Sequence, residues 1–164
     1  MEKKKFELTS DTKIVFGKKL FRIKALIDFG NVNKGELGGY VEKEENLSHE
    51  GNAWIYGDAR VYDDARVYGD ARVYGNAKIY DDALISGNAE IYGNDDYLCF
   101  KGLGSCNRNT TFFKCKDGHI HVSCGCFSGN LAEFEAKVKE THGESKFAKE
   151  YLACINVVKI HFEV

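Results

Sequence analysis

The middle of the chain repeats one pattern of apolar and polar positions every six residues. From Gly51 the sequence reads GNAWIY, GDARVY, DDARVY, GDARVY, GNAKIY, DDALIS and GNAEIY. Each hexad holds one alanine and, two residues later, one β-branched residue. The β-branched series is Ile55, Val61, Val67, Val73, Ile79, Ile85 and Ile91, and the alanine series is Ala53, Ala59, Ala65, Ala71, Ala77, Ala83 and Ala89. Because phased apolar positions need burial, this tract predicts an ordered repeat rather than a disordered segment.

Each hexad has the composition of a short strand followed by a tight corner. β-Branched residues suit an extended backbone, and Gly-Asn, Gly-Asp and Asp-Asp tolerate left-handed backbone angles. The corner residue repeats every eighteen positions, with glycine at Gly57 and Gly75 and aspartate at Asp63 and Asp81. Three hexads therefore make one coil. We predict a mainly β fold, a left-handed parallel β-helix of hexapeptide repeats.

The helix is expected to begin before the strict repeat. Val41 and Leu47 lie in phase with Ala53 at six-residue steps. On that phase the helix spans residues 38–94 and contains about three coils.

Residues 1–37 are expected to cap this helix, since an open coil exposes backbone and core. Lys13–Phe16 and Leu20–Phe29 flank Gly17-Lys18-Lys19. Two apolar runs around a short turn predict an N-terminal β-hairpin.

Beyond residue 94 the period is lost, and residues 95–164 are expected to form a small α+β domain. Asn130 and Glu133 have the spacing of a capping box, which begins a helix that ends near Gly143. A second helical stretch follows from Phe147. Three strands are expected before the helices, at Tyr97–Phe100, Thr111–Cys115 and His119–Cys124.

Tyrosine follows the aliphatic residue in most hexads and should point outward. An eighteen-residue coil stacks these rings in two columns, and tyrosine is enriched in protein interfaces. The alternative is that the columns only stabilise the sheet face. The predicted interface residues are Tyr56, Tyr74 and Tyr92 in one column and Tyr62 and Tyr80 in the other.

Composition and charge narrow the possible partners. The 164 residues are 43% hydrophobic and 29% charged, with a formal net charge of -2. This balance argues against DNA, RNA or anionic membrane as a partner. No apolar run approaches the ~18 residues of a membrane span, and no apolar segment follows the basic start. Without a secretion signal, the six cysteines are expected to be free thiols of a cytoplasmic protein.

Two stretches resemble a known group of proteins. Ala25-Leu26-Ile27-Asp28-Phe29, Gly38-Gly39-Tyr40-Val41 and Gly51-Asn52-Ala53-Trp54-Ile55 resemble bacterial and phage hexapeptide-repeat proteins that are labelled polymer-forming or cytoskeletal-like. Asn107-Arg108-Asn109-Thr110-Thr111 and Gly125-Cys126-Phe127-Ser128-Gly129 resemble a domain that follows such repeats in phage and prophage genes. The resemblance implies the fold, a homotrimer and a phage-type accessory role, such as anti-defence sequestration of a signal or inhibition of a host defence protein, in the host cytoplasm. It implies no established activity.

Enzymes on the same fold are an alternative. Hexapeptide-repeat acyltransferases and carbonic anhydrases both resemble this chain in fold, and both rely on histidines in or beside the coils. Residues 51–94 contain no histidine, and His49 stands alone before them. We therefore expect a protein that is not an enzyme and that has no cofactor.

The cysteines and histidines near the C-terminus are candidates for a metal site or a nucleophile. The cluster Cys115, His119, His121, Cys124 and Cys126 lacks the spacing of zinc knuckles, so no metal site is expected. On a strand, the two histidines share one face while Cys124 takes the other. Cys126 is a candidate nucleophile beside His142 or His121 at a helix start, but no orienting carboxylate is evident, and a packed thiol is the simpler interpretation.

The preferred ligand site is the loop Lys101–Thr111, which follows the first strand expected in residues 95–164. Its small, donor-rich groups and its two cations are suited to a phosphate or carboxylate. The predicted ligand-binding residues are Lys101, Ser105, Asn107, Arg108, Asn109, Thr110 and Thr111. The leading hypothesis is a homotrimer that binds an anionic, nucleotide-like small molecule between subunits. The alternative is an inhibitor or scaffold that binds a host protein through its tyrosine-rich face.

Overall fold

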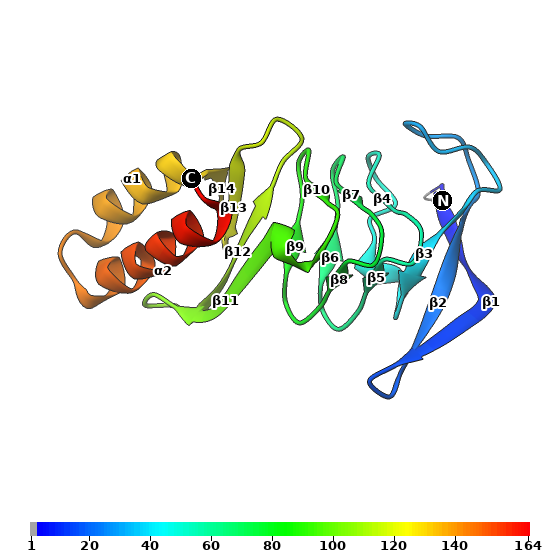
Figure 1. Ribbon diagram of the computed structural model, residues 1–164, viewed down its shortest axis with the longest axis horizontal. Helices are drawn as coiled ribbons and strands as arrows, with labels where there is room; N and C mark the ends of the chain where they lie inside the picture. The colour runs from blue at the N-terminus through cyan, green and yellow to red at the C-terminus, as the bar shows by residue number, and fades with distance from the viewer. Residues whose placement is uncertain (1–2) are drawn as a thin grey trace. The chain divides into compact units, whose positions relative to one another are not determined.

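The protein is described here by a computed structural model of residues 3–164, which form two compact units divided after Asn94. The N-terminal hairpin and the repeats belong to the first unit, and the second unit begins at Asp95 (Figure 1). The strands of the first unit are β1 Phe6–Val15, β2 Lys18–Ala25, β3 Leu37–Val41, β4 Trp54–Ile55, β5 Arg60–Val61, β6 Arg66–Val67, β7 Arg72–Val73, β8 Lys78–Ile79, β9 Leu84–Ile85 and β10 Glu90–Ile91, with a short 3-10 helix η1 at Glu44–Asn46.

The repeats form a β-solenoid with three parallel ladders. β4, β7 and β10 make one ladder, β6 and β9 a second, and β5 and β8 a third that continues into β3. In the regular part, Trp54 pairs with Arg72 and Arg60 pairs with Lys78, so paired residues are eighteen positions apart. All seven β-branched residues and all seven alanines of the repeat have 0% exposure. The predicted interior positions are therefore confirmed.

The corners adopt the left-handed backbone that their composition predicted. Asp63 and Asp81 have φ values of 58° and 57°, and Gly57 and Gly75 have 60° and 63°. Aspartate pays a steric cost in this region that glycine does not. The Asp63 carboxylate accepts a hydrogen bond from the backbone N–H of Asp81, which links successive corners.

The first turn of the solenoid is longer than the later ones, and one predicted phase is wrong. Val41 pairs with Val61 and Leu47 with Val67, at spacings of twenty residues. Val41 and Leu47 therefore occupy the β-branched positions and not the alanine positions that six-residue counting gave them. The reason is two extra residues between Leu47 and Trp54, a segment that contains His49.

Side chains complete the hydrogen bonding at the irregular first turn. The alanine carbonyls of each coil accept from the preceding coil, as Ala71 O does from Trp54 N, so carbonyls that follow the irregular first turn need other donors. The Lys5 ammonium, 1% exposed, donates to Ala53 O at 2.8 Å and Gly51 O at 3.4 Å. The buried amide of Asn46 donates in the same way to Ala65 O and Asp63 O.

Burial of Lys5 should make the stability of the first unit depend on pH. Burial lowers the pKa of Lys5 from 10.5 to about 8, and Asp70 opposes the shift. Between these values the unfolded chain binds more protons, so stability rises with pH. From pH 8 to 9.5 we expect the free energy of unfolding to rise by about 1–2 kcal/mol through this group. Urea unfolding of the wild type and Lys5→Met at both pH values checks this, and an equal pH dependence in the two proteins would contradict it.

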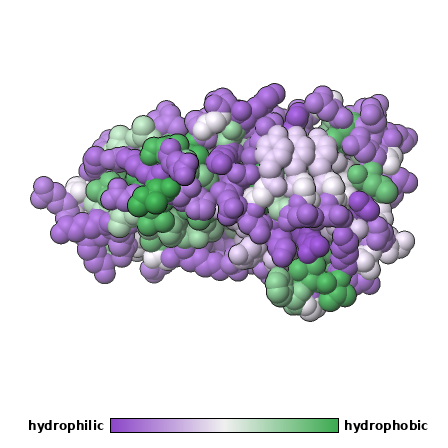
Figure 2. All heavy atoms as spheres, in the orientation of Figure 1, coloured by the Kyte–Doolittle hydropathy of each residue, from purple (hydrophilic) through white to green (hydrophobic). Residues whose placement is uncertain are grey.

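The N-terminal hairpin turns one residue earlier than predicted. β1 and β2 pair antiparallel from Val15 and Lys18 outward, and the turn is Phe16-Gly17, with both residues at positive φ. Such a two-residue turn matches the twist of paired strands. Ile14 and Phe16 are 69% and 82% exposed, and Figure 2 shows this apolar tip in green.

The second unit packs two helices on one face of an antiparallel sheet (Figure 1). The capping box of Asn130 and Glu133 and the end of the first helix at Gly143 are confirmed. The strand β14 was not predicted, because its residues Phe127–Asn130 read as a turn. The elements are η2 Asn94–Asp96, β11 Tyr97–Leu103, β12 Arg108–Lys114, β13 Ile120–Cys124, β14 Phe127–Asn130, α1 Leu131–His142 and α2 Lys146–Phe162.

No helix formed by residues 3–164 has the length and apolar character that crossing a membrane requires.

Candidate functional site

A small pocket opens in the second unit beside two adjacent turns. The β11–β12 turn and the β13–β14 turn lie at the same end of the sheet, because Leu103 pairs with Arg108 and Cys124 pairs with Phe127. The pocket has a volume of about 220 Å³. Its lining residues, none of which is a carboxylate, are Arg108, Cys124, Cys126, Phe127, Phe134, Lys137, Val138, Thr141, His142 and Tyr151.

Arg108 is held in this pocket by a glycine that leaves room for it. The Arg108 Nη1 atom lies 1.6 Å from the position that a Cβ at Gly125 would take, and Gly125 has a φ of +59°. Only glycine fits both the backbone angle and the guanidinium. A hydrogen bond with Cys106 is the main cause that raises the pKa of Arg108. The side chain is exposed and carries a permanent charge.

The floor of the pocket is made of neutral polar groups. The Cys124 thiol accepts a hydrogen bond from Thr110 Oγ1 at 3.1 Å, and Tyr151 OH donates to Leu103 O at 3.3 Å. Burial is the main cause that raises the pKa of Tyr151, which therefore stays a neutral phenol. The His142 ring stacks on Tyr151 with 5.6 Å between centroids.

This arrangement can hold one small anionic group. Arg108 offers a planar set of donors that fits phosphate or carboxylate, and Lys137 adds positive charge, although it also pairs with Glu140. Pockets for whole drug-sized ligands have volumes of about 300–1,000 Å³. At about 220 Å³, the pocket accommodates a phosphate group or a small carboxylate better than an entire nucleotide.

The structure spreads the predicted ligand residues along a hairpin instead of gathering them in a loop. Arg108 and Thr110 lie on the helix-facing side of β12, like the core residue Phe112, while Asn109 and Thr111 alternate to the other side. Thr111 is buried and donates to Cys99 Sγ at 3.7 Å. Of the seven predicted residues, only Arg108 lines the pocket. Lys101, Ser105 and Asn107 are exposed, and Thr110 bonds Cys124 behind it.

The helix residues that line the pocket were missed by sequence reasoning. Lys137 and Thr141 are four residues apart on α1 and therefore share one face of the helix. The capping box predicts where α1 begins, so the shared helix face of Lys137 and Thr141 could be inferred from the sequence. The sequence does not reveal which edge of the sheet this face packs against.

The arrangement around Cys126 differs from the predicted nucleophile. Cys126 and His142 both line the pocket, but no hydrogen bond between the described residues joins them. Cys126 precedes the strand β14 and does not stand at the start of a helix. At the start of α1, the backbone N–H groups of Asn130 and Glu133 each donate to the side chain of the other residue, so neither is free to bind a ligand.

His49 lies beside a groove of the first unit but has no nitrogen left for proton transfer. Its Nδ1 accepts the backbone N–H of Lys5 at 3.1 Å, so Nε2 carries the proton and donates to Glu44 at 2.7 Å. Phe6 stacks on the ring. The groove of about 930 Å³ is lined by Glu44, Glu45 and Glu50 against Lys3 and Arg66, among other residues. This charge balance does not favour an anion.

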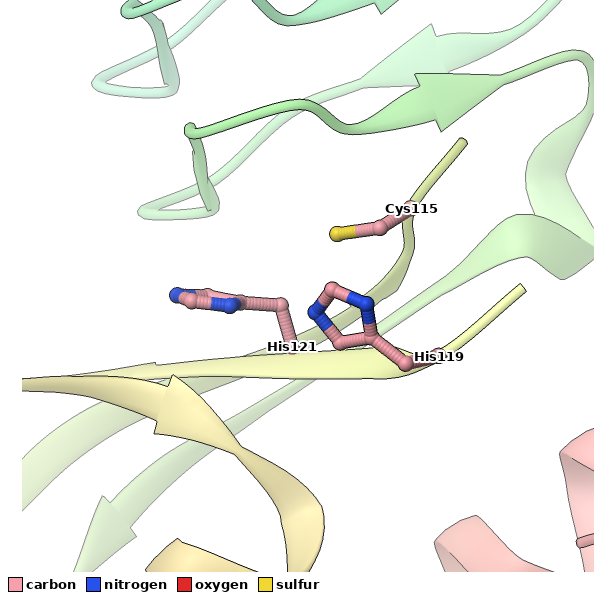
Figure 3. A group of neighbouring side chains, drawn as sticks. All are labelled: Cys115, His119 and His121. Carbon is pink, nitrogen blue, oxygen red and sulfur yellow. The ribbon is translucent and has the colours of Figure 1, made fainter. Parts of the chain in front are cut away.

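Cys115, His119 and His121 gather around one point in the second unit (Figure 3). One potential donor atom from each lies within 4.8 Å of the others. Burial raises the pKa of the Cys115 thiol to about 12, with a contribution from Asp117. Burial and the neighbouring His119 lower the pKa of His121. Cys124 lies in the helix-facing core with Ile120, as its strand position predicted.

The tyrosine columns are present, and their exposure is uneven. Tyr56 stacks on Tyr74 and Tyr74 on Tyr92, each with 4.7 Å between ring centroids, and Tyr62 stacks on Tyr80 at 5.5 Å. Tyr92 and Tyr80 are 60% and 42% exposed. Tyr62 is 5% exposed, in a cluster with Val15, Leu20 and Tyr40 of the hairpin sheet, so it is not available to a partner.

The comparison with known families bears on the first unit. The family model of the YdcK beta-solenoid repeat matches residues 53–69 and 65–78. No curated protein shows significant similarity to the chain. The matched segments contain the first four residues of the β-branched series, the first five of the alanine series and the parallel strands from β4 to β7. The chain thus contains a β-solenoid repeat.

Proposed function

We propose that this chain is a non-catalytic binding protein whose second unit holds a small anion at Arg108. The observation that carries the proposal is the pocket of about 220 Å³ that Arg108, Lys137 and His142 help to line and that has no carboxylate among its lining residues. A guanidinium can give phosphate or carboxylate two parallel charge-assisted hydrogen bonds. The solenoid offers no histidine with a free nitrogen, which favours binding over acyl transfer.

The assembly is proposed to be a homotrimer built on a left-handed solenoid of three coils. The eighteen-residue pairing of the strands supports three hexads per coil, and the β1–β2 hairpin is proposed to cap one end by joining β3. A phosphate fits the pocket of one copy, so the rest of a nucleotide-like ligand would contact a second subunit. In this proposal the protein acts in a host cytoplasm as a phage-type accessory that sequesters the ligand.

The test combines the mass of the assembly with the molecules that it carries. Light scattering of the purified protein should give a mass near three chains of 18.4 kDa. Mass spectrometry of the supernatant after denaturation should find a phosphorylated or carboxylated small molecule. A strictly monomeric protein at micromolar concentration would remove the trimer and the shared ligand.

A second candidate function is supported by the tyrosine columns. Tyr74 and Tyr92 form a continuous aromatic stack that ends in a well-exposed ring. Exposed aromatic rings of this kind are typical of protein interfaces. If this face binds a host defence protein, Tyr74→Ser and Tyr92→Ser should abolish its capture, while Arg108→Ala should not.

A further inference from the structure

We propose that Cys115, His119 and His121 form a binding site for one zinc ion. Cys115 directly follows β12, His119 directly precedes β13 and His121 lies in β13. Figure 3 shows the Cys115 side chain and both imidazole rings on the same side of β13. A thiolate and two imidazoles are ligands that zinc prefers over the oxygen ligands of magnesium or calcium.

The separation of the donor atoms is compatible with an ion. Zinc–nitrogen and zinc–sulfur bonds of about 2.0–2.3 Å place tetrahedral ligand atoms roughly 3.4–3.8 Å apart. The donors of Cys115, His119 and His121 lie within 4.8 Å of one another. Binding an ion would require the donors to move together by about 1 Å. The His119 side chain is 36% exposed.

Each histidine already uses one ring nitrogen and keeps the other for an ion. The Asp117 carboxylate is hydrogen-bonded to His119 Nδ1, which leaves Nε2 as the free nitrogen. The Ser128 hydroxyl is 2.8 Å from His121 Nε2, which leaves Nδ1. A carboxylate or hydroxyl on the far nitrogen is the usual outer partner of a zinc-binding histidine, because it fixes the ring and its tautomer.

The backbone around the turn sets the position of these groups. Cys115 N donates to His119 O at 3.0 Å, and Gly118 N donates to Cys115 O at 2.9 Å. The turn therefore brings Cys115 across from His119, and His121 follows two residues later on the same side of β13. The fourth position of a tetrahedral ion would be filled by water or by a ligand.

The experiment measures zinc and cobalt binding to the full chain after removal of metal. In calorimetry the wild type should bind one zinc per chain and should not bind Mg²⁺. With Co²⁺ it should show a thiolate-to-cobalt charge-transfer band. Cys115→Ser should lose the band, and Asp117→Asn should bind zinc about tenfold to hundredfold more weakly. Cys154→Ser, which removes a thiol of α2, is the matched control and should bind as the wild type does.

The contradicting results are equally specific. If the wild type binds no zinc in stoichiometric amount, the site does not exist. If Cys115→Ser retains full affinity and the cobalt band, the ion sits at other thiols and the assignment is overturned. Circular dichroism checks that each variant folds. If Cys115→Ser does not fold, His121→Asn serves as the second variant of a proposed zinc ligand.

Discussion

Replacing Ile79 with alanine is expected to lower the free energy of unfolding of the first unit by about 2–5 kcal/mol. Ile79 has 0% exposure and pairs with Val61 in the interior of the solenoid. The β-branched side chain fills the space between corners, and two-residue strands cannot shift far to close a cavity. The loss should therefore lie well above the effect of a surface substitution.

The measurement can follow the solenoid alone. Trp54 is the only tryptophan and is fully buried in the first unit, so its fluorescence reports the unfolding of that unit. Urea denaturation of Ile79→Ala should shift the midpoint, while Ile14→Ala, which changes an isoleucine that is 69% exposed, should shift it little. Equal shifts for the two variants would mean that Ile79 does not belong to a packed interior.

Replacing Arg108 with alanine is expected to weaken binding of phosphate or a small carboxylate about tenfold to hundredfold, the range for a hydrogen bond to a charged group. Arg108→Lys should restore only part of the affinity, because lysine lacks the planar fork. Gly125→Ala should also weaken binding, since its methyl group would displace the guanidinium. Calorimetry with inorganic phosphate and a panel of linear and cyclic nucleotides measures all three effects.

A matched control separates this pocket from the general charge of the protein. Arg66→Ala removes an exposed arginine of the solenoid and should leave the affinity unchanged. The Arg108 and Arg66 variants should unfold at the wild-type urea concentration, because both side chains lie outside the buried apolar positions. Equal losses in Arg66→Ala and Arg108→Ala would assign the binding to net charge and remove the site.

The repeat was predictable because its chemistry is local. A six-residue period fixes which side chains are buried, and the aspartate and glycine corners need the same backbone wherever they occur. The first turn could not be predicted from the six-residue period, because two extra residues before Trp54 interrupt that period. Lys5 and Asn46, which are distant in the sequence, supply the hydrogen bonds that the regular repeat would otherwise make there. Those contacts depend on tertiary structure and leave no periodic signal.

The pocket and the histidine cluster were harder to predict for a related reason. Arg108 meets Gly125 only because β12 and β13 are neighbours in a particular register, with Thr110 opposite Cys124. Cys115 meets His119 because a short turn folds one strand back on the next. Spacing rules for zinc knuckles do not describe this hairpin, so the sequence gives no signal for the three side chains that it brings together.

The most direct test of the account is to map where an anion binds on the intact protein. Two-dimensional nitrogen–proton NMR spectra of the full chain, recorded during a titration with inorganic phosphate, report each backbone amide and the Arg108 side chain separately. We expect saturable shifts at Arg108, Gly125 and Cys126 and unchanged signals along the solenoid strands. Shifts that do not saturate, or that fall on the solenoid and leave Arg108 and Gly125 unchanged, would contradict the proposal that the second unit holds the ligand.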